Sequence, residues 1–193
     1  MKKTSIALAV VATILLTGCF GNTNSATPAN TQITGFKPYE TSDFTIQIPE
    51  EWEVLTAANF RQDTPPNTVV AFRSNLRNPV FTANLIILKN DLSGEIPSID
   101  YAKALQQKTA TELNGYRELT VSDYKLIVSK AETATLYESV EGRNMDSADL
   151  KVFEFISAVK GKTAYIVMGS MLTNEQEAVA KKIETAIKSF EVK

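Results

Sequence analysis

The 193-residue sequence contains no histidine and only one cysteine, Cys19. Without histidine the chain lacks the usual general base, the usual proton shuttle and the commonest ligand of transition metals. A single thiol can form neither a disulfide within the chain nor a cysteine-based zinc site. The eight glycines form neither Gly-x-x-x-x-Gly-Lys nor Gly-x-Gly-x-x-Gly, the patterns that cradle phosphates. These absences exclude most catalytic sites, so we expect a protein that is not an enzyme and needs no cofactor.

The chain also lacks runs of basic residues. Its formal net charge is −2, and it falls to −4 when Lys2 and Lys3 are removed with a cleaved leader. A mildly acidic surface argues against nucleic acid as a partner and against electrostatic binding to anionic lipid headgroups. Contact with a membrane should therefore depend on covalently attached lipid.

No apolar run is long enough to cross a bilayer, which takes about 20 residues. The longest, Ile6 to Leu16, has eleven residues and follows Lys2 and Lys3, which is the layout of a bacterial secretory signal. It ends in Leu16-Thr17-Gly18-Cys19. This motif resembles the lipobox of bacterial lipoproteins, and the resemblance implies that Cys19 is acylated and becomes the mature N-terminus.

These features divide the chain into a lipoprotein signal peptide (residues 1–18), a flexible tether (19–38) and a folded domain (39–193). The tether is predicted from a stretch rich in Asn, Thr, Ser and Ala that has few large apolar residues. The domain should lie on the extracytoplasmic side of the cell membrane or outer membrane, held there by the acyl chains on Cys19.

The domain sequence alternates strand and helix patterns. Phe44, Ile46 and Ile48 alternate with polar residues, which predicts a strand with one solvated face. The segment Trp52 to Leu55 is expected to pair back onto it. Within Phe81 to Leu88, four consecutive apolar residues predict a strand covered on both faces, so helices should lie on both sides of the sheet.

A helix is expected from Ser98 to Asn114, followed by Gly115 in a left-handed conformation. A closing helix should begin with a capping box of Thr173 and Gln176. Its apolar stripe predicts a core face. The stripe consists of Val179, Ile183, Ile187 and Phe190. The strands expected between the helices are Glu118–Ser129, Ala131–Val140, Leu150–Val159 and Thr163–Met171.

The order of these elements, with Phe-x-Ile-x-Ile-Pro-x-x-Trp (Phe44 to Trp52) at the start and Ser189-Phe190 at the end, resembles the PsbP-like superfamily. That superfamily includes PsbP of photosystem II, the Ran-binding Mog protein and bacterial DcrB-type lipoproteins. The resemblance implies an α+β fold, in which a twisted antiparallel β-sheet is flanked by helices on both faces as an α/β/α sandwich. It also implies an accessory role in binding or assembly.

Two acidic groups are candidate sites. Glu50, Glu51 and Glu53 flank Trp52, and they should form either a solvated corner or a patch where a partner docks. A second group of oxygen ligands could hold calcium, although its spacing is not that of an EF-hand, and an exposed loop is the alternative. This second group consists of Glu141, Asp146 and Asp149.

The sequence thus predicts a membrane-anchored envelope lipoprotein that binds a protein partner through sheet edges or loops. Two alternatives remain open. One is a carrier of a small apolar ligand between sheet and helix. The other is a cryptic hydrolase based on carboxylates or on Ser170. Because no histidine can activate the Ser170 hydroxyl, this hydrolase would need a lysine such as Lys162 beside it.

Overall fold

The computed structural model describes residues 32–62, 64–144 and 147–193. Cys19, the lipobox motif before it and Asp146 lie outside the described residues. The first strand begins at Phe36, ahead of Tyr39, where the sequence predicted the domain to start. The Phe36 side chain is 7% exposed and belongs to the core, so the folded part takes in the end of the expected tether.

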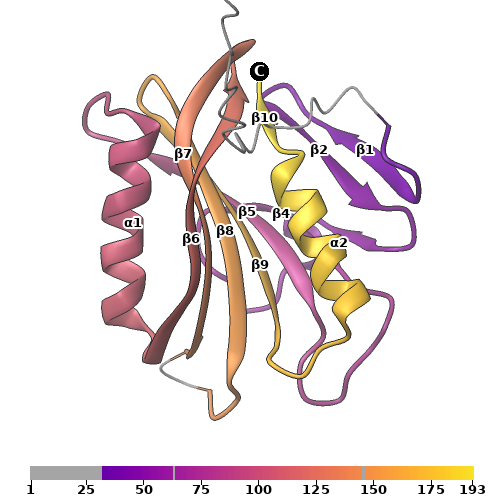
Figure 1. The fold of residues 1–193 in the computed structure, drawn as a ribbon. Helices are drawn as coiled ribbons and strands as arrows, with labels where there is room; N and C mark the ends of the chain where they lie inside the picture. The colour runs from indigo at the N-terminus through magenta and orange to yellow at the C-terminus, as the bar shows by residue number, and fades with distance from the viewer. Residues whose placement is uncertain (1–31, 63, 145–146) are drawn as a thin grey trace, which may run out of the picture.

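The described residues form ten strands, two α-helices and one short 3-10 helix, η1 (Figure 1). Most elements match the segments predicted from the sequence. Their bounds are β1 Phe36–Glu40, β2 Phe44–Pro49, β3 Glu53–Leu55, η1 Ala57–Asn59, β4 Thr68–Arg73, β5 Asn84–Asp91, α1 Ser98–Glu112, β6 Asn114–Val128, β7 Ala131–Arg143, β8 Lys151–Lys160, β9 Thr163–Leu172, α2 Glu177–Lys188 and β10 Glu191–Val192.

All strands belong to one sheet with the order β1-β2-β10-β6-β7-β8-β9-β5-β4-β3. Neighbouring strands are antiparallel except β10 and β6, which are parallel. The sheet is therefore mixed. Helix α2 leads the chain into β10, which then runs parallel to β6. The segment after Trp52 also differs from the prediction, since β3 pairs with β4 and not with the preceding strand.

The sheet curls around α2 as a half-barrel (Figure 1). Strands β1 and β4 lie near opposite ends of the strand order, yet the rings of Tyr39 and Phe72 approach edge to face at 5.1 Å between centroids. Lys89 Nζ on β5 also bonds Asp43 Oδ2, just before β2, at 2.6 Å. The curl thus brings the two halves of the sheet together around one core.

The larger part of the core lies on the α2 side of the sheet and includes Val179, Ile183 and Ile187, as the apolar stripe predicted. A smaller cluster of Phe153, Phe155 and Val140 packs against residues of α1. On β8 the even-numbered Ile156 and Ala158 face α2, whereas the odd-numbered Phe153 and Phe155 face α1. The helices therefore pack on opposite faces of this strand, and the α+β class is confirmed. Full α/β/α layering of the whole sheet stays a prediction.

Helix α2 packs very closely on β9. A Cβ atom added to Gly169 would lie 2.1 Å from Ile183 Cγ2, so only glycine fits there. The predicted capping box is wrong, because α2 begins after Gln176 and has no side-chain cap. The prediction of a solvated face on β2 is also wrong at Gln47. This residue is 1% exposed, and its backbone N–H donates to Ser189 Oγ at 2.8 Å.

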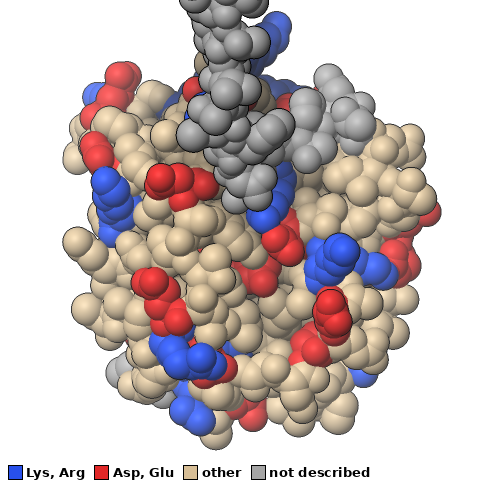
Figure 2. Space-filling view, in the orientation of Figure 1, with Lys and Arg blue, Asp and Glu red and all other residues tan. Residues whose placement is uncertain are grey.

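Charges on the face shown in Figure 2 are interspersed, and acidic and basic side chains alternate without a broad region of one sign. On this one face, the pattern agrees with the absence of basic runs from the sequence.

Candidate functional site

The acidic residues around Trp52 have separate partners. Trp52 is 2% exposed and belongs to the core, as expected. Glu50 is exposed, and its backbone carbonyl accepts a hydrogen bond from Lys37 Nζ at 2.6 Å. Glu51 forms an ion pair with Lys182 of α2. Glu53, at the start of β3, belongs to a larger network, so the three carboxylates do not act as one acidic patch.

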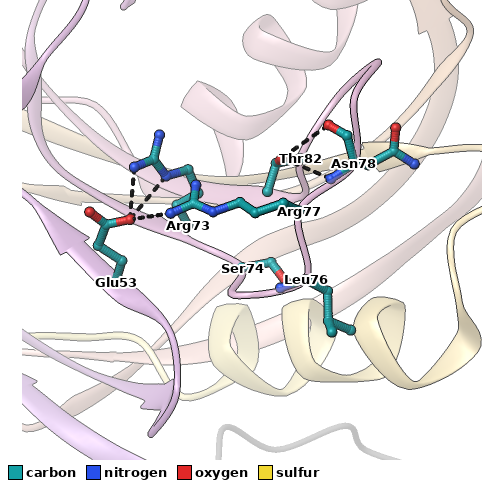
Figure 3. A network of polar contacts seen from close by, with 7 residues as sticks. All are labelled: Glu53, Arg73, Ser74, Leu76, Arg77, Asn78 and Thr82. Atoms are coloured by element: carbon teal, nitrogen blue, oxygen red, sulfur yellow. Dashed lines mark hydrogen bonds and ion pairs between the residues drawn. The ribbon is translucent and has the colours of Figure 1, made fainter.

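Glu53 accepts hydrogen bonds from two arginines (Figure 3). Its Oε2 lies 2.7 Å from Arg73 Nη2, 3.2 Å from Arg73 Nε and 2.7 Å from Arg77 Nη2. Arg73 comes from β4, which pairs with β3 opposite Glu53. Arg77 reaches back from the loop that follows. Two cations thus share one carboxylate, leaving this corner with a net positive charge.

The network keeps Glu53 ionised. Hydrogen bonds from Arg73 and then Arg77 hold the pKa of its carboxyl below the usual value. The side chains remain open to solvent, with 45% of Glu53 and 52% of Arg77 exposed. An ion pair this exposed contributes little to stability.

The β4–β5 loop (residues 74–83) is held in one shape by local hydrogen bonds. Asn78 Oδ1 accepts from the backbone N–H of Val80 at 2.8 Å and of Phe81 at 3.4 Å. At the base of the loop, the Ser74 N–H donates to the Ala83 carbonyl at 2.9 Å. Lys151 Nζ lies 4.3 Å from the centre of the Phe81 ring, which fixes the end of the loop on β8.

This ordered loop exposes two large apolar side chains. Leu76 is 50% exposed and Val80 is 60% exposed, more than the other large apolar residues described as exposed. Figure 3 shows Leu76 pointing away from Glu53, while Arg77 extends toward it. We call Glu53, Arg73, Leu76, Arg77 and Val80 the arginine corner. Sequence reasoning found only Glu53 of this set, although arginines beside apolar residues and Asn78-Pro79 were visible signals.

The predicted calcium group is only partly described. Glu141 is engaged with Arg117, whose Nη2 lies 3.0 Å from Glu141 Oε2. Asp149 lies in the loop before β8, and its backbone N–H donates to Ser147 Oγ. Asp146 lies outside the described residues. Among residues 32–62, 64–144 and 147–193, no group of three or more Cys, Asp or Glu side chains could hold a metal ion.

Ser170 does not have the setting of a nucleophile. It lies within β9 and is only 5% exposed. Lys162 precedes the strand by one residue, so eight residues of extended chain, roughly 26 Å, separate the two. The structure therefore contradicts a Ser170–Lys162 dyad.

Space for a ligand is limited on the α2 side. Val179, Ile183 and Ile187 fill the gap between helix and sheet, and Gly169 has no room even for a methyl group. A groove of about 300 Å³ runs instead along the surface between Ile33 and Phe36 on one side and α2 on the other. This groove lies at the rim of α2 and not in the layer between the sheet and the helix.

Neither free edge of the sheet suits the addition of a partner strand. β1 carries Lys37 and Pro38, a cation and a residue without an N–H group. β3, at the other edge, has only three residues and begins with Glu53. Short, charged or proline-containing edges discourage pairing with another chain.

No protein-family model matches the sequence, and no curated protein matches it either. The fold does have solved counterparts. Cyanobacterial PsbP (CyanoP) from Synechocystis matches with a TM-score of 0.51 and 12% identity, covering 84% of this chain and 95% of CyanoP. The chain has a PsbP-like fold.

Two other PsbP-like matches have the same TM-score of 0.51. LpqN of Mycobacterium tuberculosis, described as involved in cell envelope biogenesis, is 12% identical over 81% of this chain and 90% of LpqN. PA94 of Pseudomonas aeruginosa, a protein of unknown function, is 11% identical over 80% of this chain and 94% of PA94. Identities this low establish the fold and not the activity. They confirm the resemblance to PsbP-like proteins made from the sequence.

Proposed function

We propose that this protein is a non-enzymatic accessory factor of the cell envelope, anchored by lipid on Cys19, that binds a protein partner through the arginine corner. The observation that carries the proposal is an ordered loop that exposes Leu76 and Val80 and that also carries Arg77, which shares the Glu53 carboxylate with Arg73. Rigid loops with exposed apolar groups and arginines are typical of binding surfaces.

Anchoring through Cys19 is supported by the lipobox-like motif and the short apolar leader. Among the described residues, neither helix has the length and apolar character to span a membrane. The match to LpqN, a protein of envelope biogenesis, supports an extracytoplasmic setting at the level of fold.

The non-enzymatic part of the proposal follows from side-chain chemistry. The sequence has no histidine, Ser170 is buried in a strand, and Glu53 is occupied by two guanidinium groups. A general base must reach the proton that it removes, and a nucleophile needs an activating neighbour. The exposed corner offers hydrogen-bond donors and apolar surface, which suit binding.

Photocrosslinking in intact cells tests this function. A photoreactive amino acid at position 76 should attach to an envelope protein, whereas one at Leu119, a 39% exposed residue on β6, should not. Cys19→Ser should release the protein from membranes or leave its precursor uncleaved. In this variant the concentration of the protein at the membrane falls, so the yield of the position-76 adduct should also fall. Equal adducts at positions 76 and 119, or unchanged anchoring of Cys19→Ser, would contradict the proposal.

The groove between β1 and α2 supports a second candidate function: the protein would carry an apolar ligand in this groove. Its volume of about 300 Å³ is at the lower end for ligand pockets, and Ile33, Phe36 and Ala178 line it. Native mass spectrometry of gently purified protein tests this alternative. A co-purified ligand that is lost in Ala178→Phe, with the fold intact, would favour the carrier.

A further inference from the structure

We propose that the arginine corner recognises a segment of its protein partner that carries a carboxylate side chain close to apolar residues. This inference rests on the proposed binding function and specifies what is bound. Its basis is the incomplete neutralisation of Arg73 and Arg77 by one carboxylate, together with exposed Leu76 and Val80 on the same loop as Arg77.

The two guanidinium groups have binding capacity left over. Each guanidinium carries five N–H donors in a planar fork. Arg73 directs Nε and Nη2 to Glu53, and Arg77 directs Nη2 to the same oxygen. About half of the Arg77 side chain is exposed to solvent. Its remaining donors can therefore meet a second carboxylate arriving from outside.

The chemistry of the corner favours a carboxylate. Glu53 Oε2 already lies 2.7 Å from an Nη2 atom of each arginine, so the arginines are arranged to bind a carboxylate oxygen. The domain as a whole carries a net negative charge, so most of its surface should repel acidic groups. The locally positive corner should attract them, and this difference favours binding of an acidic segment at the corner.

The apolar residues favour a protein segment over a lipid surface. Binding to an anionic membrane takes a cluster of several basic residues, whereas the corner has two arginines that share one carboxylate. The loop itself is ordered by Asn78 and by the Ser74–Ala83 hydrogen bond, so little entropy is lost when a partner covers it. A rigid apolar surface flanked by arginines is typical of a protein interface.

The experiment uses the full-length lipidated protein in its own membranes, with the photoreactive amino acid at position 76 and mass spectrometry of the crosslinked peptide. We expect the attached segment to contain Asp or Glu near apolar residues. Arg77→Gln should lower the adduct yield about fivefold. Added salt should lower the adduct yield of the protein with Arg77 intact more than that of the Arg77→Gln variant, because salt screens the charge of Arg77.

Two further variants separate recognition from loss of structure. Glu53→Gln removes the internal competitor, so the adduct yield should rise or stay unchanged even though the ion pairs are broken. Arg117→Gln is the matched control. Arg117 is an exposed arginine on β6 that is paired with Glu141 on β7, and replacing it should not change the adduct yield. Urea unfolding should show that all three variants are folded.

Contrary outcomes fall into two distinguishable groups. A protein adduct at position 76 without acidic residues, or a yield insensitive to Arg77→Gln, overturns this inference but leaves the binding function standing. An adduct to lipid or to a second copy of the chain also overturns it. Absence of any protein adduct at position 76 overturns both the inference and the proposed function.

Discussion

Carboxylates in two regions of this molecule behave in opposite ways. Glu53 in the arginine corner is exposed, and guanidinium hydrogen bonds lower its pKa. Glu138 and Glu154, on the central strands β7 and β8, are 1% and 8% exposed, and burial raises the pKa of each to about 7. Within the described residues, each of these two has one carboxylate oxygen without a hydrogen-bond partner. The comparison separates an exposed carboxylate that is kept ionised by arginines from buried carboxylates whose neutral form is favoured.

The largest difference between the regions should be in stability. Phe190 is fully buried, with its ring centre 5.5 Å from that of Phe44, so Phe190→Ala should lower the free energy of unfolding by about 3–5 kcal/mol. Leu76→Ala in the corner should change it by less than about 0.5 kcal/mol. Urea unfolding of both variants measures the contrast. Similar losses in the two would remove the distinction between core and corner.

The buried glutamates should make stability depend on pH. Because the folded pKa of Glu154 lies at about 7 and the usual value is 4.5, the protonated folded form is favoured. Neutral Glu154 contributes fully to the free energy of unfolding below pH 4.5. This contribution is lost as the pH rises to 7, at about 1.4 kcal/mol per pKa unit. Glu154→Gln should therefore raise the free energy of unfolding by up to about 3 kcal/mol at pH 8.

Unfolding of this variant at two pH values provides the check. At pH 4 the glutamine variant and the unsubstituted protein should have nearly the same stability, because both side chains are neutral. The corner supplies the control: Glu53→Gln should not stabilise the protein at pH 8. If the effect of Glu154→Gln were the same at pH 4 and pH 8, the pKa of Glu154 would not be raised in the folded protein.

The close contact between α2 and β9 gives the next prediction. Gly169→Ala places a methyl group against Ile183 and should cost about 1–3 kcal/mol in unfolding free energy. Ile183→Ala opens space at the same point, so the double variant should lose less than the sum of the two single losses. Additive losses, measured by urea unfolding, would mean that the two residues do not meet.

The corner network should contribute little to stability. Glu53→Gln breaks exposed ion pairs to Arg73 and Arg77, and it should leave the midpoint of thermal unfolding almost unchanged. High salt should shrink this difference further, because exposed charges are screened. A loss of several kcal/mol, unaffected by salt in thermal unfolding, would show that the network supports the fold.

Sequence patterns predicted the parts of the fold that are governed by local periodicity. The strand at Phe44–Pro49, the positive φ of Gly115 and the buried stripe of α2 all follow from neighbouring residues. Long-range pairing was not predicted. The parallel contact of β10 with β6 and the pairing of β3 with β4 depend on the curl of the whole sheet.

The same reasoning explains why the site was predicted only in part. Glu53 was identified because three acidic residues surround Trp52. Arg73 and Arg77 are 20 and 24 residues away in sequence, and they reach Glu53 only because β3 pairs with β4. The exposure of Leu76 likewise depends on the hydrogen bonds that shape the loop. The arginines and the turn residues Asn78-Pro79 were visible in the sequence, but their meeting with Glu53 depends on tertiary structure and could not be predicted from a local pattern.

The central claim is that the arginine corner binds a partner and is not needed for folding. The double variant Leu76→Ser/Val80→Ser, carrying the photoreactive amino acid at position 75, an exposed residue of the same loop, tests it most directly when adduct yield and urea unfolding are measured on the same preparation. We predict an unfolding free energy within about 1 kcal/mol of the parent and a partner adduct that is largely lost. An undiminished adduct would contradict the claim, as would loss of the adduct together with loss of the fold.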